Sequence, residues 1–168
     1  MQVPADDLIK YHCPRWQELP DIELYVDQVV SFLQSNLAIL MKDKENPVIT
    51  ASMINNYVKQ DVLEAPIKKK YNKRHMAYLF VICIFKRLMS ISEIGESITL
   101  MQRLYSVEDG YNMFCEELEN ALKRAVSPES KPCNILAETE IREIATLRAI
   151  VSAFAATVLV DRLILLRK

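Results

Sequence analysis

The sequence contains only two glycines, Gly95 and Gly110, and this scarcity limits what the 168-residue chain can fold into. Sheets with tight strand connections depend on glycine where the backbone turns sharply. The apolar residues also recur at spacings of three and four rather than two, which is the period of a helix face. Since 51% of the residues are hydrophobic, the chain can bury a real core. We therefore expect an all-α helical bundle in which any sheet is small.

Proline and capping residues divide the first half of the chain. Pro20 is placed as a first-turn residue and predicts a helix that runs through about Met41. Thr50 is a suitable N-cap for a short helix over residues 51–60. Residues 61–71 contain Pro66 and lack a helical period, so they are expected to form a tight loop or a two-stranded wing.

The second half shows the same pattern of caps. Asn72 predicts the start of a helix in which Met76 to Phe85 are ten consecutive nonpolar or aromatic positions, so this helix must be covered on most sides. Ser90 and Ser106 predict two further helix starts. After a linker bounded by prolines, a last helix is expected from about Ile135 to Leu166.

Charge is concentrated in one part of the chain, although the net formal charge is only −1. Residues 59–87 contain just two acidic residues, Asp61 and Glu64. An otherwise acidic protein with one basic segment suits a molecule that docks a polyanion through one face. The eight basic residues of this segment are Lys59, Lys68, Lys69, Lys70, Lys73, Arg74, Lys86 and Arg87.

The short helix predicted over residues 51–60 has a polar outer face next to this basic segment. Ile54, Tyr57 and Val58 are expected to face inward, and Ser52, Asn55, Asn56 and Lys59 outward. Asparagine can pair bidentately with adenine, and lysine can meet guanine or phosphate. A solvated helix face is the alternative interpretation.

The lysine-rich turn and the helix after it complete the candidate DNA-binding residues. Clustering beside an Asn/Lys helix favours phosphate binding over a loop that only aids solubility. Tyr71 could donate to phosphate or anchor the wing on the core, and His75 is expected to be a packed histidine. The candidates here are Lys68, Lys69, Lys70, Tyr71, Lys73 and Arg74.

Several other functions are not expected. The spacing of His12, Cys13, Cys115 and Cys133 matches no common structural zinc set, so no metal or cofactor is predicted. The sequence lacks a glycine-rich phosphate loop and the motifs of common hydrolases, so we do not expect an enzyme. Cysteines without paired spacing indicate reduced thiols and a cytoplasmic protein. The apolar run from Ala149 to Val160 has only twelve residues, which is short of the roughly 20 that a membrane span needs.

The chain resembles a bacterial family of unknown function over roughly residues 16–120. The residues that carry this likeness are Leu19 to Tyr25, the string Thr50-x-x-Met-Ile-Asn-Asn-Tyr-Val-Lys59, and Lys69-Lys70-Tyr71 with His75. On these motifs the chain is identified as similar to the family called domain of unknown function (DUF1836). That resemblance implies no activity by itself.

A weaker likeness is to the DNA-binding half of MerR-type transcriptional regulators. Met53 to Lys59 resembles the recognition helix of that family, and Pro66 to Tyr71 resembles its wing. The chain departs from the MerR pattern in having Asn55-Asn56-Tyr57 where that family usually carries Arg-Tyr-Tyr. It also has a long helix in place of a short first one, and no metal-binding cysteines. The resemblance implies a winged helix-turn-helix head over residues 16–105.

Residues 106–168 are expected to form a C-terminal helical region for dimerisation or effector binding. We predict a sequence-specific transcriptional regulator that binds double-stranded DNA as a homodimer and does not enter a membrane. A helical protein-interaction module, or a small-molecule sensor with an unidentified effector, remains the alternative. The dimer is expected because the last helix has more apolar residues than one layer would cover: Leu147, Ile150, Val151, Phe154, Ala155, Val158, Leu159, Leu163, Ile164 and Leu166.

Overall fold

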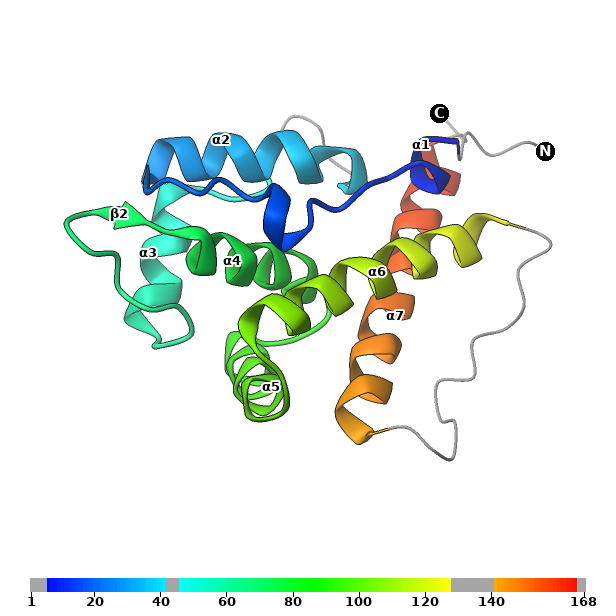
Figure 1. The fold of residues 1–168 in the computed structure, drawn as a ribbon. Coiled ribbons are helices and arrows are strands. Elements are labelled where there is room, and N and C mark those ends of the chain that lie inside the picture. The colour runs from blue at the N-terminus through cyan, green and yellow to red at the C-terminus, as the bar shows by residue number, and fades with distance from the viewer. Residues whose placement is uncertain (1–5, 42–45, 128–140, 166–168) are drawn as a thin grey trace.

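The protein is mostly helical, as the sequence predicts, in a computed structural model that describes residues 6–41, 46–127 and 141–165 (Figure 1). The described part contains one two-stranded sheet. Its elements are α1 (Asp6–Ile9), η1 (Trp16–Glu18), β1 (Leu24–Tyr25), α2 (Val26–Leu37), η2 (Ala38–Leu40), α3 (Ala51–Lys59), β2 (Lys70–Tyr71), α4 (Lys73–Phe85), α5 (Ile91–Leu104), α6 (Val107–Val126) and α7 (Arg142–Leu165).

Helix α4 lies in the centre of the molecule, which confirms the prediction made from its apolar run. Nine of the ten residues from Met76 to Phe85 are buried, and only Val81 is partly exposed. The helix packs against α2, α6, α7 and β2. Because its neighbours come from all parts of the chain, α4 organises the core.

The helix predicted from Pro20 begins later than expected, at Val26. The preceding residues Leu24 and Tyr25 form β1, which pairs antiparallel with β2. Ile22, which the predicted helix would include, is 69% exposed and lies outside the core. The prediction was wrong here because strand pairing with a distant segment outweighs the local helical period. The inward stripe of α2 and η2 consists of Val29, Leu33, Leu37 and Leu40.

The predicted caps are found where the sequence places them. Asn72 Oδ1 accepts a hydrogen bond from His75 N at 3.2 Å at the start of α4. Ser90 and Glu93 form a reciprocal capping box at the start of α5. Ser106 Oγ accepts from Asp109 N at 3.1 Å at the start of α6. Side-chain acceptors thus satisfy N–H groups that the helix itself leaves without partners.

Helix α7 crosses α6 and forms the layer at the opposite end of the molecule from α3 (Figure 1). It begins at Arg142 in the structure, whereas the sequence predicts a start near Ile135. Residues 135–140 lie outside the described residues. Ion pairs fix it at three points: Arg148 to Glu117 at 2.8 Å, Arg87 to Asp161 at 2.7 Å and Arg162 to Asp7 at 2.8 Å.

Half of the ten apolar residues named for the last helix are buried within the chain. Leu147, Val151, Phe154, Ala155 and Val158 are all buried. They pack against neighbouring helices of the same chain, so they do not provide the exposed patch from which a dimer was predicted. Exposed apolar residues remain near the end of the helix, at Val160, Ile164 and Leu165.

Within the described residues, α7 is also a helix long and apolar enough to cross a membrane by length and composition. This differs from the twelve-residue estimate because the whole helix from Arg142 to Leu165 passes the test. A mostly buried core helix of a soluble protein has the same length and composition, but only 33% of the apolar window of α7 is buried, where it packs on α6 and its neighbours.

Aromatic contacts join the two predicted regions into one core. Phe80 of α4 lies edge-on to Phe32 and to Tyr111, with ring centroids 6.1 Å apart in both pairs. Phe85 and Phe114 form a further edge contact at 5.9 Å. The interior therefore continues across the predicted boundary at residue 105.

Candidate nucleic-acid interface

Helix α3 is short, and both of its ends are fixed by hydrogen bonds. Thr50 Oγ1 accepts from a backbone N–H of the first turn at 3.2 Å. At the other end, Val62 N donates to Tyr57 O and Asp61 N donates to Val58 O, both at 3.1 Å. This pair of bonds is a Schellman motif, with Asp61 in the left-handed region at φ 56°. A nine-residue helix is marginal in isolation, so these caps and its packing hold it in place.

The two faces of α3 divide as the sequence predicts. Ile54 is 0% and Tyr57 3% exposed, so these side chains anchor the helix on the core. Burial raises the pKa of Tyr57 to about 12, which keeps its hydroxyl protonated. The exposed face carries Ser52, Asn55, Asn56 and Lys59.

The lysine-rich segment forms a tight turn from Ile67 to Lys70. Lys70 N donates to Ile67 O at 2.9 Å, which closes the turn. Lys68 and Lys69 occupy its central positions with φ 51° and 63°. Positive φ at both positions is typical of a type I′ turn, where Asn-Gly is the least strained pair. The turn is thus built from two lysines that both adopt an unfavourable backbone conformation.

The turn is attached to the body through the small sheet. In the register of β1 and β2, Leu24 lies opposite Tyr71 and Tyr25 opposite Lys70. Lys70 Nζ also lies 5.6 Å from the ring centre of Tyr25. Lys68 and Lys69 are exposed and make no ion pair with any residue that the structure describes. Figure 1 shows this turn projecting at the same end of the molecule as α3.

Tyr71 and His75 form the base of the wing. The Tyr71 side chain is 3% exposed and its ring meets His75 edge-on at 5.4 Å, which is the arrangement of an anchor. His75 is also buried, and its Nδ1 accepts a hydrogen bond from Asn72 N at 3.1 Å. Burial lowers the pKa of His75, although the charge and backbone of Glu64 oppose part of this shift. The ring is therefore neutral near pH 7.

The next two basic residues are already paired within the protein. Lys73 Nζ lies 3.1 Å from Asp21 Oδ1 and 5.7 Å from the ring centre of Trp16. Arg74 lies 3.2 Å from Glu64 Oε1. A phosphate would have to compete with these carboxylates, so the two side chains are weaker candidates than Lys68 and Lys69.

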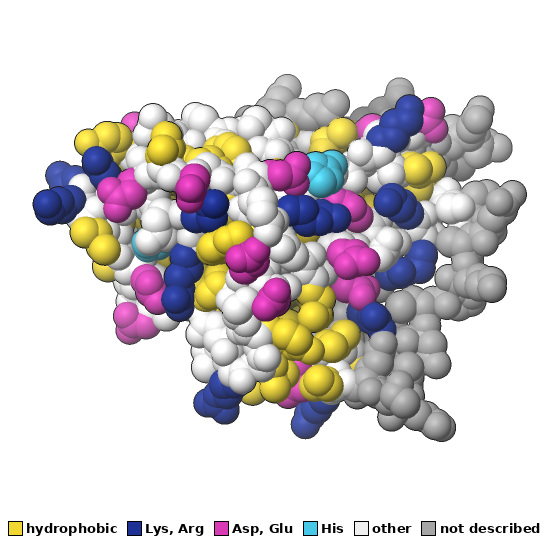
Figure 2. Space-filling model, in the orientation of Figure 1, with side chains coloured by type: hydrophobic (Ala, Val, Ile, Leu, Met, Phe, Trp, Pro, Cys, Tyr) yellow, Lys and Arg dark blue, Asp and Glu magenta, His cyan; other side chains and the backbone are white. Residues whose placement is uncertain are grey.

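Two members of the basic segment lie away from the interface. Lys86 Nζ donates to Val48 O at 2.6 Å, and Arg87 pairs with Asp161 of α7. Seen from the side shown in Figure 2, acidic side chains alternate with basic ones around the wing. The predicted basic segment is therefore less concentrated in space than along the sequence.

The sequence did not indicate a role for Glu119, because together with Glu116 and Glu117 it resembles the solvated side of a helix. Its carboxylate accepts two hydrogen bonds from Arg15, at 2.7 and 3.0 Å, and one from Cys13 N at 2.9 Å. Burial acts to raise the pKa of Glu119, but Arg15 and the backbone N–H outweigh it and the net pKa is lowered. This clasp ties the N-terminal segment to α6.

The same region contains the residues considered for zinc. Cys13 and Cys115 are buried, and burial raises the pKa of the Cys13 thiol well above its usual range. A protonated thiol is a poor metal ligand. Among the described residues, no group of three or more His, Cys, Asp or Glu side chains is arranged to hold a metal ion. Cys133 lies outside the described residues.

Comparison with known proteins gives one match. The model of a family described as domain of unknown function (DUF1836) matches residues 14–121. No curated protein and no solved structure matches the sequence. The matched range starts beside Arg15 and ends just after Glu119, so it includes the wing, α3 and the clasp.

Proposed function

This chain belongs to the DUF1836 family, and we propose that it is a sequence-specific transcriptional regulator that binds double-stranded DNA. The observation that carries the proposal is the exposed face of α3. Its two amides and one ammonium group, on Asn55, Asn56 and Lys59, point to solvent from a helix whose opposite side is fixed in the core. Such groups read base edges when a helix enters the major groove.

The size of α3 suits this role. A helix with its side chains is about 10–12 Å across, which fits the major groove of about 12 Å. The nine residues of α3 give it a length of about 13 Å at about 1.5 Å per residue. Asn55 and Asn56 would pair with adenine edges, and Ser52 and Lys59 lie about one turn away on either side. The exposed side chains could therefore contact about three successive base pairs.

The wing supplies a phosphate contact in this proposal. Backbone strain that persists at an exposed turn is a reason to look for a function. Lys68 and Lys69 place two ammonium groups where Asn-Gly would be more stable, and a phosphate backbone would be attracted to both. The order β1, α2, α3, β2, α4, α5 supports a MerR-like winged helix-turn-helix head, with α3 as its second helix.

We further propose that the regulator is a cytoplasmic homodimer. Val160 and Ile164 are 52% and 41% exposed near the end of α7, far from α3 in Figure 1. Pairing there would leave both reading helices available for two half-sites. Sedimentation velocity tests this: Val160→Ser/Ile164→Ser should shift a dimer to the monomer, and a wild-type chain that stays monomeric at high concentration would disprove it.

Selection of bound sequences from random duplexes, followed by mobility shift, tests DNA recognition. Asn55→Ala and Asn56→Ala should each relax the preference at one or two base pairs and weaken specific binding about tenfold or more. Lys68→Ala/Lys69→Ala should weaken binding to all sequences alike. Lys123→Ala removes an exposed lysine of α6 and is the matched control.

One observation favours a second function, a protein-interaction module. Asp61, Glu64 and Glu23 are exposed around the same lysines, and Ile67 of the turn is 65% exposed, so the surface mixes signs and has an apolar tip. The two functions differ in their response to salt. Phosphate neutralisation predicts a steep fall in affinity as salt rises, whereas a mixed-charge protein interface predicts a shallow one. If the selection enriches no sequence, sequence-specific DNA binding is rejected and this second function is retained.

A further inference from the structure

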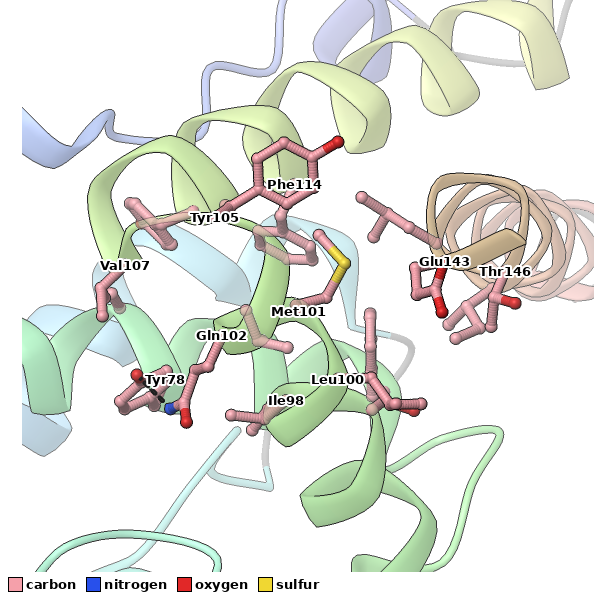
Figure 3. Close-up of a pocket in the computed structure, with 18 of the residues that line it drawn as sticks. Tyr78, Ile98, Leu100, Met101, Gln102, Tyr105, Val107, Phe114, Glu143 and Thr146 are labelled. Carbon is pink, nitrogen blue, oxygen red and sulfur yellow. Dashed lines mark hydrogen bonds between the residues drawn. The ribbon is translucent and has the colours of Figure 1, made fainter. Parts of the chain in front are cut away.

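A cavity of about 360 Å³ lies between α4, α5, α6 and α7 (Figure 3). Figure 3 shows Leu100 and Met101 of α5 facing Glu143 and Thr146 of α7 across it. Its walls are mainly apolar, from residues such as Val81, Phe85, Ile98, Phe114, Leu147 and Ile150.

Gly110 lines this cavity and leaves space there that a side chain would take. A helix-interior glycine destabilises a helix by about 1 kcal/mol relative to alanine, so its presence needs a reason. At Gly95 a Cβ would lie close to the Val62 side chain, 3.4 Å from its Cγ2. At Gly110, which lines the cavity, a Cβ would meet only Tyr105 Cβ at 3.8 Å, an ordinary contact. A side chain at this position would have room, and it would project where a ligand could lie.

We propose that this cavity binds an uncharged, largely apolar organic molecule with two or three rings or a comparable aliphatic body. An apolar cavity of about 150 Å³ holds benzene, so one of 360 Å³ holds a molecule roughly twice that size. Arg142 and Glu143 carry opposite charges at the same wall, so the cavity favours neither an anion nor a cation. At the edge of the cavity Gln102 donates to the hydroxyl of Tyr78, and the amide oxygen of Gln102 remains able to accept a hydrogen bond.

Helix α5 connects this cavity to the head. Its C-terminal half lines the cavity through Ile98 and Met101. Nearer its start, a Cβ added at Gly95 would lie 3.4 Å from Val62 Cγ2, and Val62 N closes the end of α3 by donating to Tyr57 O. Only Ile94 of this helix is fully buried, so α5 is less firmly held than its neighbours. A ligand that packs against Met101 therefore acts on a helix that also lies beside the residue closing the end of α3. An effect of the ligand on DNA affinity, transmitted through α5, rests on the proposed function. Binding of the ligand to the cavity does not.

Fluorescence titration of the full chain with N-phenyl-1-naphthylamine, an uncharged probe that brightens in apolar surroundings, tests the binding site. Wild type should show saturable enhancement with one probe per chain. Gly110→Leu fills the cavity and should weaken binding about tenfold or more. Gly110→Ala is the matched control, because its methyl group meets only Tyr105, and it should stay within about threefold of wild type.

Both substitutions should raise the melting temperature by about 2 to 4 °C, because they replace a helical glycine. If the melting temperature of a variant is equal to or above that of wild type, a loss of probe binding cannot be attributed to unfolding. If Gly110→Leu has a lower melting temperature than wild type, Val107→Phe is used as the test variant instead, because it adds volume to the cavity from another position. Equal probe binding in wild type and the filled variant, or enhancement that never saturates, would overturn the site.

Mobility shift with and without the probe tests the connection to the head. A change of threefold or more in wild-type DNA affinity, absent in Gly110→Leu, is expected. Saturable probe binding without any change in DNA affinity would overturn the coupling and leave the binding site standing. A chain that binds the probe but no DNA would reject the proposed function instead, so the two failures are distinguishable.

Discussion

Replacing the two lysines at the tip of the wing should make the protein more stable and a weaker DNA binder at once. The substitution is Lys68→Asn/Lys69→Gly, which installs the pair preferred at a type I′ turn. Lys68 and Lys69 have φ 51° and 63°, and a residue other than glycine is destabilised by roughly 1 kcal/mol in that region. Glycine relieves most of this but adds freedom to the unfolded chain.

The net gain in the free energy of unfolding should therefore be about 1 kcal/mol. For a chain of this length, that corresponds to an increase of about 2 to 4 °C in melting temperature. Urea titration followed by circular dichroism measures the free energy, and calorimetry measures the melting temperature. Both lysines are exposed and make no ion pair with the described residues, so their removal should carry no compensating loss.

DNA binding should change in the opposite direction. Each phosphate contact contributes about 0.9 to the slope of log affinity against log salt, so removing two should lower its magnitude by about 2. Lys123→Asn is the control, since it removes one exposed charge on α6 without touching the wing. Unchanged stability would refute the strain argument. An unchanged salt slope would refute the phosphate contact, and the two results are independent.

Three further predictions concern residues that the fold itself depends on. Glu119→Gln should lower the free energy of unfolding by about 2 to 4 kcal/mol in urea titration, because it leaves Arg15 without its carboxylate partner. A loss below about 0.5 kcal/mol would count against the clasp. The folded pKa of His75 lies below its usual 6.5, so the stability that it contributes is present above pH 6.5 and is lost as pH falls toward the folded pKa. His75→Gln keeps the capping box. The free energy of unfolding should fall less in this variant than in wild type between about pH 7.5 and about pH 5.5. Equal falls in the two proteins would show that other groups cause the pH dependence. Asp61→Gly should raise the melting temperature by about 1 to 3 °C, because φ 56° suits glycine, and a lower value would show that the Asp61 side chain stabilises the end of α3.

Local chemistry was enough to predict most of the helices. The caps at Thr50, Asn72, Ser90 and Ser106 depend on a side chain and a backbone group three residues apart, so the sequence specifies them directly. The same holds for the central helix, because an uninterrupted apolar run can only be satisfied by burial.

Contacts between distant segments were not predictable in this way. The strand at Leu24 and Tyr25 forms because Lys70 and Tyr71 pair with it, and no local period encodes that pairing. Glu119 is read as a solvated side chain until Arg15 is known to lie opposite.

In the candidate interface, sequence reasoning placed the exposed face of α3 where the structure has it. Asn55, Asn56 and Lys59 follow from the helical period once Ile54 is assigned to the core. The electrostatic part was harder to predict, because it depends on which carboxylates fold back onto the lysines and arginines. Asp21 reaches Lys73 across the sheet, and Glu64 reaches Arg74 from the wing loop.

The clasp between Arg15 and Glu119 has a kinetic consequence. Its partners are 104 positions apart in the chain, so closing the loop between them costs conformational entropy and we expect this contact to form late in folding. An interaction made that late is absent from the transition state for folding, and its free energy appears in the rate of unfolding. The clasp should therefore govern the lifetime of the native state more than the speed at which the chain reaches it.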